Sequence, residues 1–164
     1  MADYLRKDVS ELISAQLLTI ANYVAQDIDR DIVLRRELLA RVASKIPPAL
    51  LHNPKQLQAW LGERHDMNPL FSLGFFVLDS SGIVLADYPV LPERAGKSYA
   101  DRDYLQQAMK GEPVIGRPVI GQASNVPVLP MAMPLRDGTG KVQAVLVGIS
   151  ELYSPNFISS VRFN

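Results

Sequence analysis

Cysteine is absent from the 164-residue sequence, which excludes disulfide bonds, thiolate zinc sites and cysteine nucleophiles. Histidine is scarce: His52 and His65 are the only two, too few for a His-rich metal centre. Neither charge is in excess, because 17 basic and 17 acidic residues balance to a net charge of zero. Nucleic-acid binding usually requires a basic excess. We therefore expect no metal site, no cofactor and no nucleic-acid partner.

Long apolar runs and the signature motifs of enzymes are also missing. The longest stretch without a charged residue, Pro118–Leu135, contains four prolines and is typical of strands rather than of a membrane span. The first twelve residues, MADYLRKDVSEL, lack the apolar region of a signal peptide. No P-loop, G-x-S-x-G, H-E-x-x-H or dinucleotide fingerprint occurs. Asp101 and Asp103 are two positions apart, so on a helix they face different sides and make a poor acid–base pair. We expect a chain without catalytic residues, and capping and surface roles for these two aspartates.

Glycine and proline are absent between Tyr4 and Ile46, where apolar residues recur every three or four positions. This spacing predicts one amphipathic helix that ends before Pro47. Such a helix is about 60 Å long at 1.5 Å per residue, which is more than a compact domain of this size needs. We expect it to project from the domain or to pair with a second copy. The alternative is that it packs on its own domain along its whole length.

The rest of the chain predicts a second helix and an antiparallel sheet. The helix begins at Pro54 and ends near Arg64. Five runs of strand-forming residues follow, with a short helix that ends near Lys110 between the second and the third. Pro118 lies inside the third run, which indicates an edge strand or a bulge there. The predicted class is α+β, with helices on a face of a five-stranded sheet; the expected strands are Leu73–Asp79, Ile83–Tyr88, 113–121, 126–135 and 141–150.

The segment GKSYADRDYLQQAMKG, Gly96–Gly111, places Arg102 and Tyr104 at the start of that short helix. We expect Ser98 or Asp101 to cap it. A guanidinium and a phenol beside free backbone amides suit a carboxylate or another small anion. The alternative is that Arg102 forms an ion pair with a nearby aspartate. The residues by themselves leave both interpretations open.

Three segments resemble, in the same order, the Cache family of PAS-like extracytoplasmic sensor domains of bacterial membrane receptors. They are FFVLDSSGIVLADYP, GKSYADRDYLQQAMKGEPVIGRPVIG and VPVLPMAMPLRDGTGKVQAVLVGISEL, and the stretch that contains them, Phe75–Leu152, covers about half of the chain. The resemblance implies a PAS-like five-stranded sheet preceded by the long helix and the second helix. It also implies three parts: helices for dimerisation and support at 1–66, the sensing domain at 67–153, and a tail towards a further region at 154–164.

In the Cache family the ligand lies between the sheet and the loop–helix segment that covers it. Arg102 matches the arginine that binds the ligand carboxylate, and Tyr104 matches an aromatic position of the pocket wall. Gly121 and Ile149 stand where the amino-acid-binding members carry two aspartates for the ammonium group. The resemblance therefore predicts a small carboxylate, a neutral molecule or no physiological small ligand rather than an α-amino acid. Further candidates for the pocket, for which an exposed edge or core packing is an equal explanation, are Arg117, Tyr99, Tyr88, Lys97, Met131 and Met133.

The family resemblance leads to a functional expectation. The chain is expected to be a periplasmic, non-catalytic ligand-sensing domain, the membrane-distal module of a two-module receptor anchored in the inner membrane. We expect a homodimer through the N-terminal helix, with a histidine kinase, a diguanylate cyclase or phosphodiesterase, or a chemoreceptor as output. The alternative is a PAS-like dimerisation module of an intracellular regulator whose pocket is filled by its own side chains.

Overall fold

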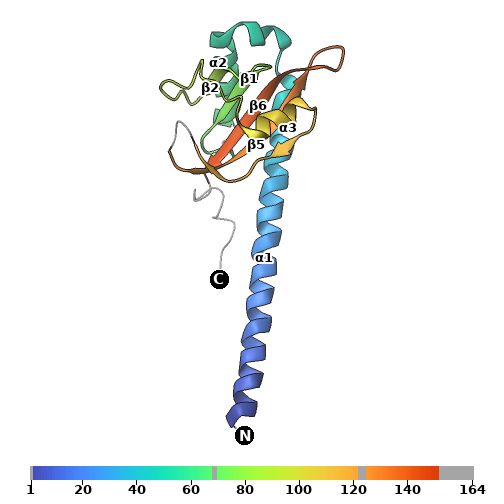
Figure 1. Cartoon of the computed structure of the whole chain (residues 1–164), viewed down its shortest axis with the longest axis vertical. Coiled ribbons are helices and arrows are strands. Elements are labelled where there is room, and N and C mark those ends of the chain that lie inside the picture. Colours follow the sequence, from blue (N-terminus) through green and yellow to red (C-terminus); the bar gives the residue numbers. More distant parts are fainter. Residues whose placement is uncertain (1, 68–69, 122–124, 152–164) are drawn as a thin grey trace.

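The computed structural model describes residues 2–67, 70–121 and 125–151, with the side chains of residues 2–5 left aside. Three α-helices, a short 3₁₀ helix and an antiparallel sheet make up this part of the chain (Figure 1). The predicted α+β class is confirmed. In chain order the elements are α1 (Ala2–Lys45), η1 (Pro48–His52), α2 (Pro54–Met67), β1 (Phe75–Asp79), β2 (Val84–Tyr88), α3 (Asp103–Met109), β3 (Val114–Ile115), β4 (Val119–Ile120), β5 (Pro127–Arg136) and β6 (Val142–Glu151).

Helix α1 is one continuous helix of 44 residues that extends far beyond the rest of the domain (Figure 1). Only its C-terminal part packs on the sheet, through Leu38, Leu39 and Val42. Its projecting part carries apolar side chains that are 44–69% exposed, which excludes packing on its own domain along the whole length; these are Val9, Leu12, Ile13, Leu17, Leu18, Ile20 and Tyr23. Among the described residues, no helix combines the length and the apolar character needed to cross a membrane.

The sheet is antiparallel and has the strand order β2-β1-β6-β5-β3, with β4 also paired to β5. The expected third strand is two short pieces, β3 and β4, which lie one after the other along the same edge. Pro118 separates them, in agreement with the expected edge position. Two aspartates close the hairpins: Asp79 Oδ1 accepts a 2.8 Å hydrogen bond from Ser81 N, and Asp137 Oδ1 accepts one of the same length from Thr139 N.

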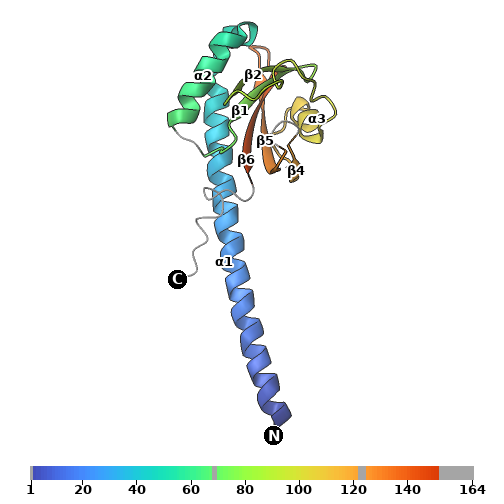
Figure 2. The same cartoon turned by 90° about the vertical axis from the view of Figure 1, so that its left-hand side faces the viewer.

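Both faces of the sheet are buried, each under a different layer. Helices α1 and α2 cover one face and α3 covers the other (Figure 2). Neighbouring residues of β1 divide between the layers, because successive side chains of a strand point to opposite faces. Phe75 and Val77 belong to the core under α1 and α2, whereas Phe76 and Leu78 belong to the core under α3. The N-terminal helices thus share a core with the sheet, and the expected tail at 154–164 lies outside the described residues.

Candidate functional site

A cavity of about 290 Å³ lies on the α3 face of the sheet, between the start of α3 and the edge pieces β3 and β4. Its wall combines two arginines, two aspartates and a tyrosine with small and apolar residues. Three residues predicted from the sequence, Arg102, Tyr104 and Arg117, come together here. The full lining is Asp101, Arg102, Asp103, Tyr104, Gln107, Val114, Ile115, Gly116, Arg117 and Val119.

The β1–β2 turn holds the segment that carries Arg102. Gly82 has a φ of +85°, a conformation that favours glycine, and its carbonyl accepts a 2.7 Å hydrogen bond from Tyr99 N. Tyr99 O in turn accepts a 3.0 Å bond from Arg102 N. The hairpin predicted from D-S-S-G therefore sets the position of Arg102.

The expected side-chain cap of the short helix is absent. Arg102 itself occupies the N-cap position of α3, and no side chain caps the helix there. Ser98 Oγ instead accepts a 3.3 Å bond from Ala100 N in the preceding turn. Because α3 begins at Asp103, Asp101 lies before the helix. The expectation that the two side chains face different sides of one helix therefore does not apply to Asp101.

The guanidinium of Arg102 has no carboxylate partner in an ion pair among the described residues. Its Cζ lies 5.8 Å from the centre of the Tyr99 ring, and the Phe76 ring lies 5.2 Å from that ring between centres. The geometry does not support the alternative in which Arg102 pairs with a local aspartate. Arg102 is half-buried and Arg117 is exposed, so both charges are available to a ligand in the cavity.

Tyr104 forms the buried wall of the cavity and is 7% exposed. Burial raises the pKa of its phenol far above the usual value, and the nearby charge of Arg102 only partly opposes this. Burial also raises the pKa of Tyr99. The hydroxyl of Tyr104 therefore keeps its proton at neutral pH and can donate a hydrogen bond.

Asp101 and Asp103 were not predicted as site residues, although both line the cavity beside the two arginines. The sequence contained a usable signal, since each stands next to Arg102 in the chain. Carboxylates and guanidinium groups in one cavity complement a ligand that carries an ammonium and a carboxylate group.

Four other candidates are set apart from this cavity. Met131 and Met133 are buried in the core under α1 and α2, on the opposite face of the sheet. Tyr88 packs on that same face, where its ring leaves no room for a side chain at Gly62 of α2. Lys97 is exposed in the loop before α3, and its carbonyl accepts a 2.9 Å bond from Val84 N. None of the four lines the cavity.

A buried ion pair lies on the face of the sheet that α3 covers. Asp87, opposite Phe76 in the β1–β2 ladder, accepts a 2.8 Å bond from Arg94 Nε. The guanidinium of Arg94 also donates to Pro89 O at 2.9 Å and lies 5.2 Å from the Phe76 ring centre. The pair is satisfied within the protein and is structural in character. Among the residues that the structure describes, no group of three or more potential metal ligands occurs.

No family model and no curated protein sequence matches this chain. Solved structures with the same fold do exist. The ligand-binding domain of the Pseudomonas aeruginosa amino acid chemoreceptor PctB, in complex with L-Arg, aligns with a TM-score of 0.68 at 20% identity over 93% of this chain and 62% of its own. The domain of PctC from the same organism, in complex with GABA, gives 0.64 at 20% identity, covering 84% and 63%.

A third similar structure is the ligand-binding domain of the Pseudomonas fluorescens chemoreceptor CtaA in complex with L-alanine. It aligns with a TM-score of 0.66 at 17% identity over 91% of this chain and 63% of its own. The chain thus spans less than two thirds of the length of each of the three structures.

These structures correct one expectation from the sequence. The prediction of a ligand other than an α-amino acid is wrong, because domains of this fold have L-Arg and L-alanine bound. The prediction depended on acidic residues being absent at Gly121, at Ile149 and between Glu112 and Asp137. In the structure the carboxylates of the cavity come instead from Asp101 and Asp103, on the loop and first turn before those positions.

The predicted resemblance is confirmed at the level of the fold. The long helix and the antiparallel sheet give this chain the Cache-type fold that the ligand-binding domains of bacterial chemoreceptors have.

Proposed function

We propose that this chain is the extracytoplasmic sensor domain of a bacterial membrane receptor, and that it binds an α-amino acid or a similar small zwitterion. The observation that carries the proposal is the cavity of about 290 Å³ with cationic and anionic side chains in one wall. Its volume is at the small end of the range for ligand pockets, which suits a molecule of amino-acid size.

Each part of such a ligand has a partner of matching chemistry. The carboxylate is assigned to Arg102, which can bind it in a bidentate manner, and to the Tyr104 hydroxyl as a hydrogen-bond donor. The ammonium group is assigned to Asp101 and Asp103, and Arg117 adds a second positive charge at the rim. The ring of Tyr99 packs against the guanidinium group of Arg102.

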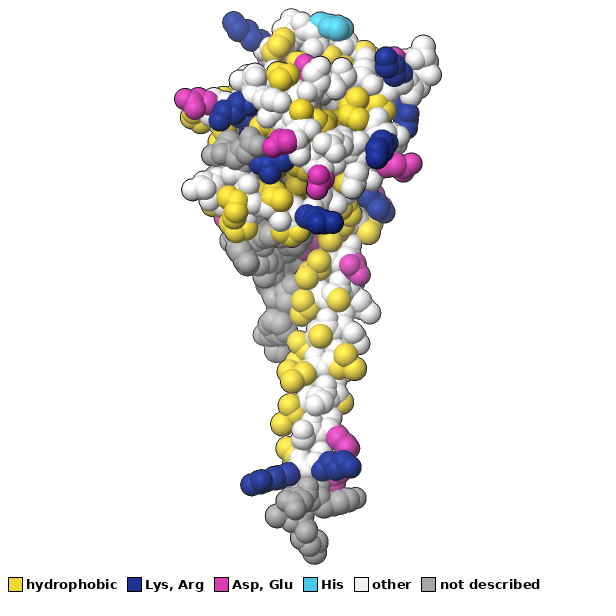
Figure 3. Space-filling model, in the orientation of Figure 1, with side chains coloured by type: hydrophobic (Ala, Val, Ile, Leu, Met, Phe, Trp, Pro, Cys, Tyr) yellow, Lys and Arg dark blue, Asp and Glu magenta, His cyan; other side chains and the backbone are white. Residues whose placement is uncertain are grey.

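The projecting part of α1 supports a second element of the proposal, a homodimer through this helix. Its apolar side chains gather along one exposed region of the helix (Figure 3). A second copy of the chain would bury this surface. A shift of α1 within such a dimer would then be transmitted along the helix towards the membrane. The output class, whether histidine kinase, cyclic-di-GMP enzyme or chemoreceptor, stays open in this proposal.

Thermal unfolding with a matched set of compounds tests the ligand assignment. L-alanine is compared with propionate, which lacks the ammonium group, and with ethylamine, which lacks the carboxylate; L-arginine and GABA extend the set. A ligand at 100 times its Kd stabilises by about 2.7 kcal/mol, which raises the Tm by about 5–10 °C in a domain of this size. We expect at least one zwitterion to reach this shift, and the matched half-molecules to fall well short of it.

Variants then locate the binding. Arg102→Ala is expected to lower the affinity for the best zwitterion by roughly 10- to 100-fold, because a charge-assisted hydrogen bond contributes about 1.5–3 kcal/mol. Lys110→Ala, an exposed cation just after α3 and outside the cavity, is the control and should leave affinity unchanged. Equal affinity of Arg102→Ala and the native protein would remove Arg102 from the site. If none of the compounds binds, the dimerisation module without a ligand becomes the better interpretation.

A further inference from the structure

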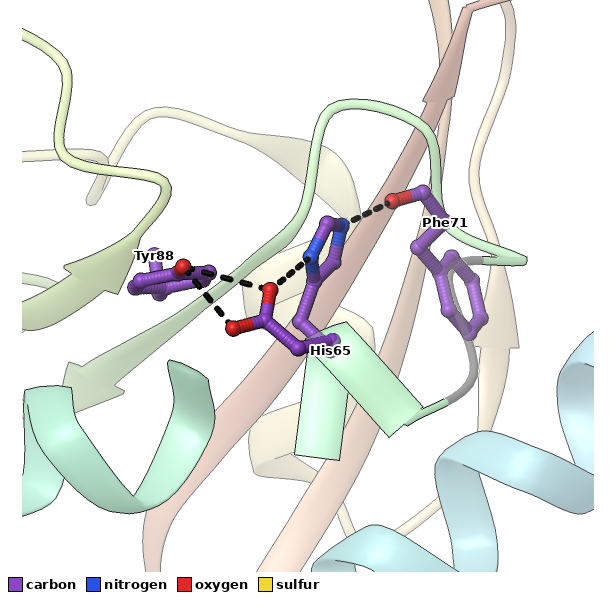
Figure 4. A network of polar contacts seen from close by, with 4 residues as sticks. His65, Phe71 and Tyr88 are labelled. Carbon is purple, nitrogen blue, oxygen red and sulfur yellow. Dashed lines mark hydrogen bonds and ion pairs between the residues drawn. The ribbon is translucent and has the colours of Figure 1, made fainter. Parts of the chain in front are cut away.

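His65, near the end of α2, has one ring nitrogen hydrogen-bonded and the other facing a carboxylate (Figure 4). Nε2 lies 3.0 Å from the carbonyl oxygen of Phe71. A carbonyl only accepts hydrogen bonds, so Nε2 carries a proton in this arrangement. Nδ1 therefore presents a lone pair when the ring is neutral. Nδ1 is buried, has no hydrogen-bond partner among the described residues, and lies 3.7 Å from Asp66 Oδ1.

The neutral ring thus leaves a buried acceptor opposite another acceptor, which is unfavourable. A proton taken from solvent onto Nδ1 converts this contact into an ion pair between the imidazolium and the Asp66 carboxylate, while the bond to Phe71 O is kept. We propose that His65 is a proton-operated latch, whose protonated form ties α2 more firmly to the sheet through Asp66 and Phe71.

The latch joins parts of the chain that are distant in sequence. Asp66 accepts hydrogen bonds from the Tyr88 hydroxyl of β2, at 3.2 Å to each carboxylate oxygen. Phe71, on the other side of His65, packs its ring against the backbone of Gly148 in β6. His65 and Asp66 therefore link α2 both to the edge strand β2 and to the segment that lies against β6.

That segment is hydrogen-bonded to the end of β6. Leu73 N donates to Ile149 O at 3.0 Å, and Ile149 N donates to Gly74 O at 2.9 Å. Ser72 Oγ accepts a further bond of 2.9 Å from Glu151 N. A change in the protonation of His65 thus affects the end of β6, on the side of the sheet that α1 and α2 cover.

Asp66 is the charged group that forms the ion pair with protonated His65. From β1 the ring of Phe75 approaches edge-on at 6.0 Å between centres, and from β2 the ring of Tyr88 lies at 5.6 Å. Tyr88 is the titratable group that faces His65 from another element in the described part of the chain, and its bond to Asp66 raises the pKa of its hydroxyl. Arg64 is turned away, with its guanidinium 4.0 Å from the Trp60 ring centre.

Thermal unfolding between pH 8 and pH 5.5 tests the latch, because carboxylates titrate below this window and tyrosines above it. All proteins carry His52→Gln, which leaves His65 as the only histidine. The ion pair exists only when the ring is protonated, so its stabilisation is present at the acidic end and is lost as the pH rises. We expect acidification to raise the Tm of this protein by about 1–3 °C more than that of the same protein with Asp66→Asn. The asparagine amide can donate to the neutral ring and so favours the opposite protonation state.

Long-range ¹H–¹⁵N spectra of the same His52→Gln protein at pH 8 supply an independent readout. The expected neutral tautomer carries its proton on Nε2. Two results would overturn the proposal: a proton on Nδ1 at pH 8, or an equal Tm gain on acidification in the Asp66→Asn protein. Asp66 is 68% exposed at its side chain, so its replacement by asparagine leaves the core intact and both measurements are informative.

Discussion

Arg94 and Asp87 form an ion pair with a 2.8 Å distance between Nε and Oδ2, and each side chain is only 2% exposed. Asp87 Oδ2 also accepts a 3.0 Å bond from Leu91 N, and Arg94 donates to Pro89 O. The pair therefore fixes the loop between β2 and the Arg102 segment, on the face of the sheet that carries the cavity.

Arg94→Met should be strongly destabilising, because it leaves the buried carboxylate of Asp87 without its cation. The expected loss is about 3–5 kcal/mol in the free energy of unfolding, measured by urea denaturation. The control is Arg30→Met, which breaks a 3.6 Å pair between the 71% exposed Arg30 and the 20% exposed Asp27 and should cost at most about 0.5 kcal/mol. A loss below about 1 kcal/mol for Arg94→Met would mean that the pair is not buried in solution.

Gly82→Ala should disturb both the β1–β2 turn and the cavity. A Cβ at this position, with φ at +85°, would lie 2.8 Å from Ala100 Cα and 2.9 Å from Ala100 N, which are backbone atoms of the segment that holds Arg102. We expect a loss of about 1–3 kcal/mol in stability and weaker binding of the best zwitterion. Gly138→Ala in the β5–β6 turn meets no atom within 4 Å and should stay within about 0.5 kcal/mol of the native protein. Similar effects from both substitutions would contradict the close packing at Gly82.

Tyr104 should make the domain sensitive to alkaline pH. Burial raises the pKa of this phenol in the folded state, so the folded protein holds the proton more tightly than the unfolded chain does. Its contribution to stability is complete below the unfolded pKa of about 10 and is lost as the pH rises above that value. Between pH 9 and pH 11.5 the Tm of Tyr104→Phe should therefore fall less steeply than that of the native protein. Parallel slopes would place Tyr104 in contact with solvent.

The projecting part of α1 should determine the oligomeric state. Light scattering coupled to size exclusion is expected to give twice the monomer mass for the native chain at micromolar concentration. The double variant Leu12→Lys and Leu17→Lys puts charges on side chains that are each 61% exposed in the single chain, so it should yield a folded monomer. Circular dichroism checks that helix content in the domain is kept. A dimer that survives this double change would place the interface elsewhere.

Much of the fold could be predicted because local signals were strong. The hairpins follow from Asp79 and Asp137, whose side chains accept backbone hydrogen bonds within their own turns. The long helix follows from an unbroken run without glycine or proline. The resemblance assigned Arg102 to a ligand pocket, and in the structure Arg102 lines the cavity; that it binds a ligand there stays a prediction.

The face on which each strand residue lies could not be predicted. Strand β5 is buried on both sides, so it lacks the polar alternation that would separate Met131 and Met133 from the residues facing the cavity. The position of Asp101 and Asp103 in the cavity wall could not be predicted for a different reason. Helical spacing separates two side chains only when both lie within one helix, whereas the chain turns at Asp101 before α3 begins.

The two apolar cores, one under α1 and α2 and the other under α3, have no side chain in common. A substitution that changes the cavity therefore repacks first against the core under α3, whose side chains are not part of the core under α1 and α2. Diversification of ligand preference and preservation of the helical support can then proceed under separate selection. For the same reason, the α3 face is the part of this domain to randomise in a library that aims at new specificities, with α1 and α2 held constant.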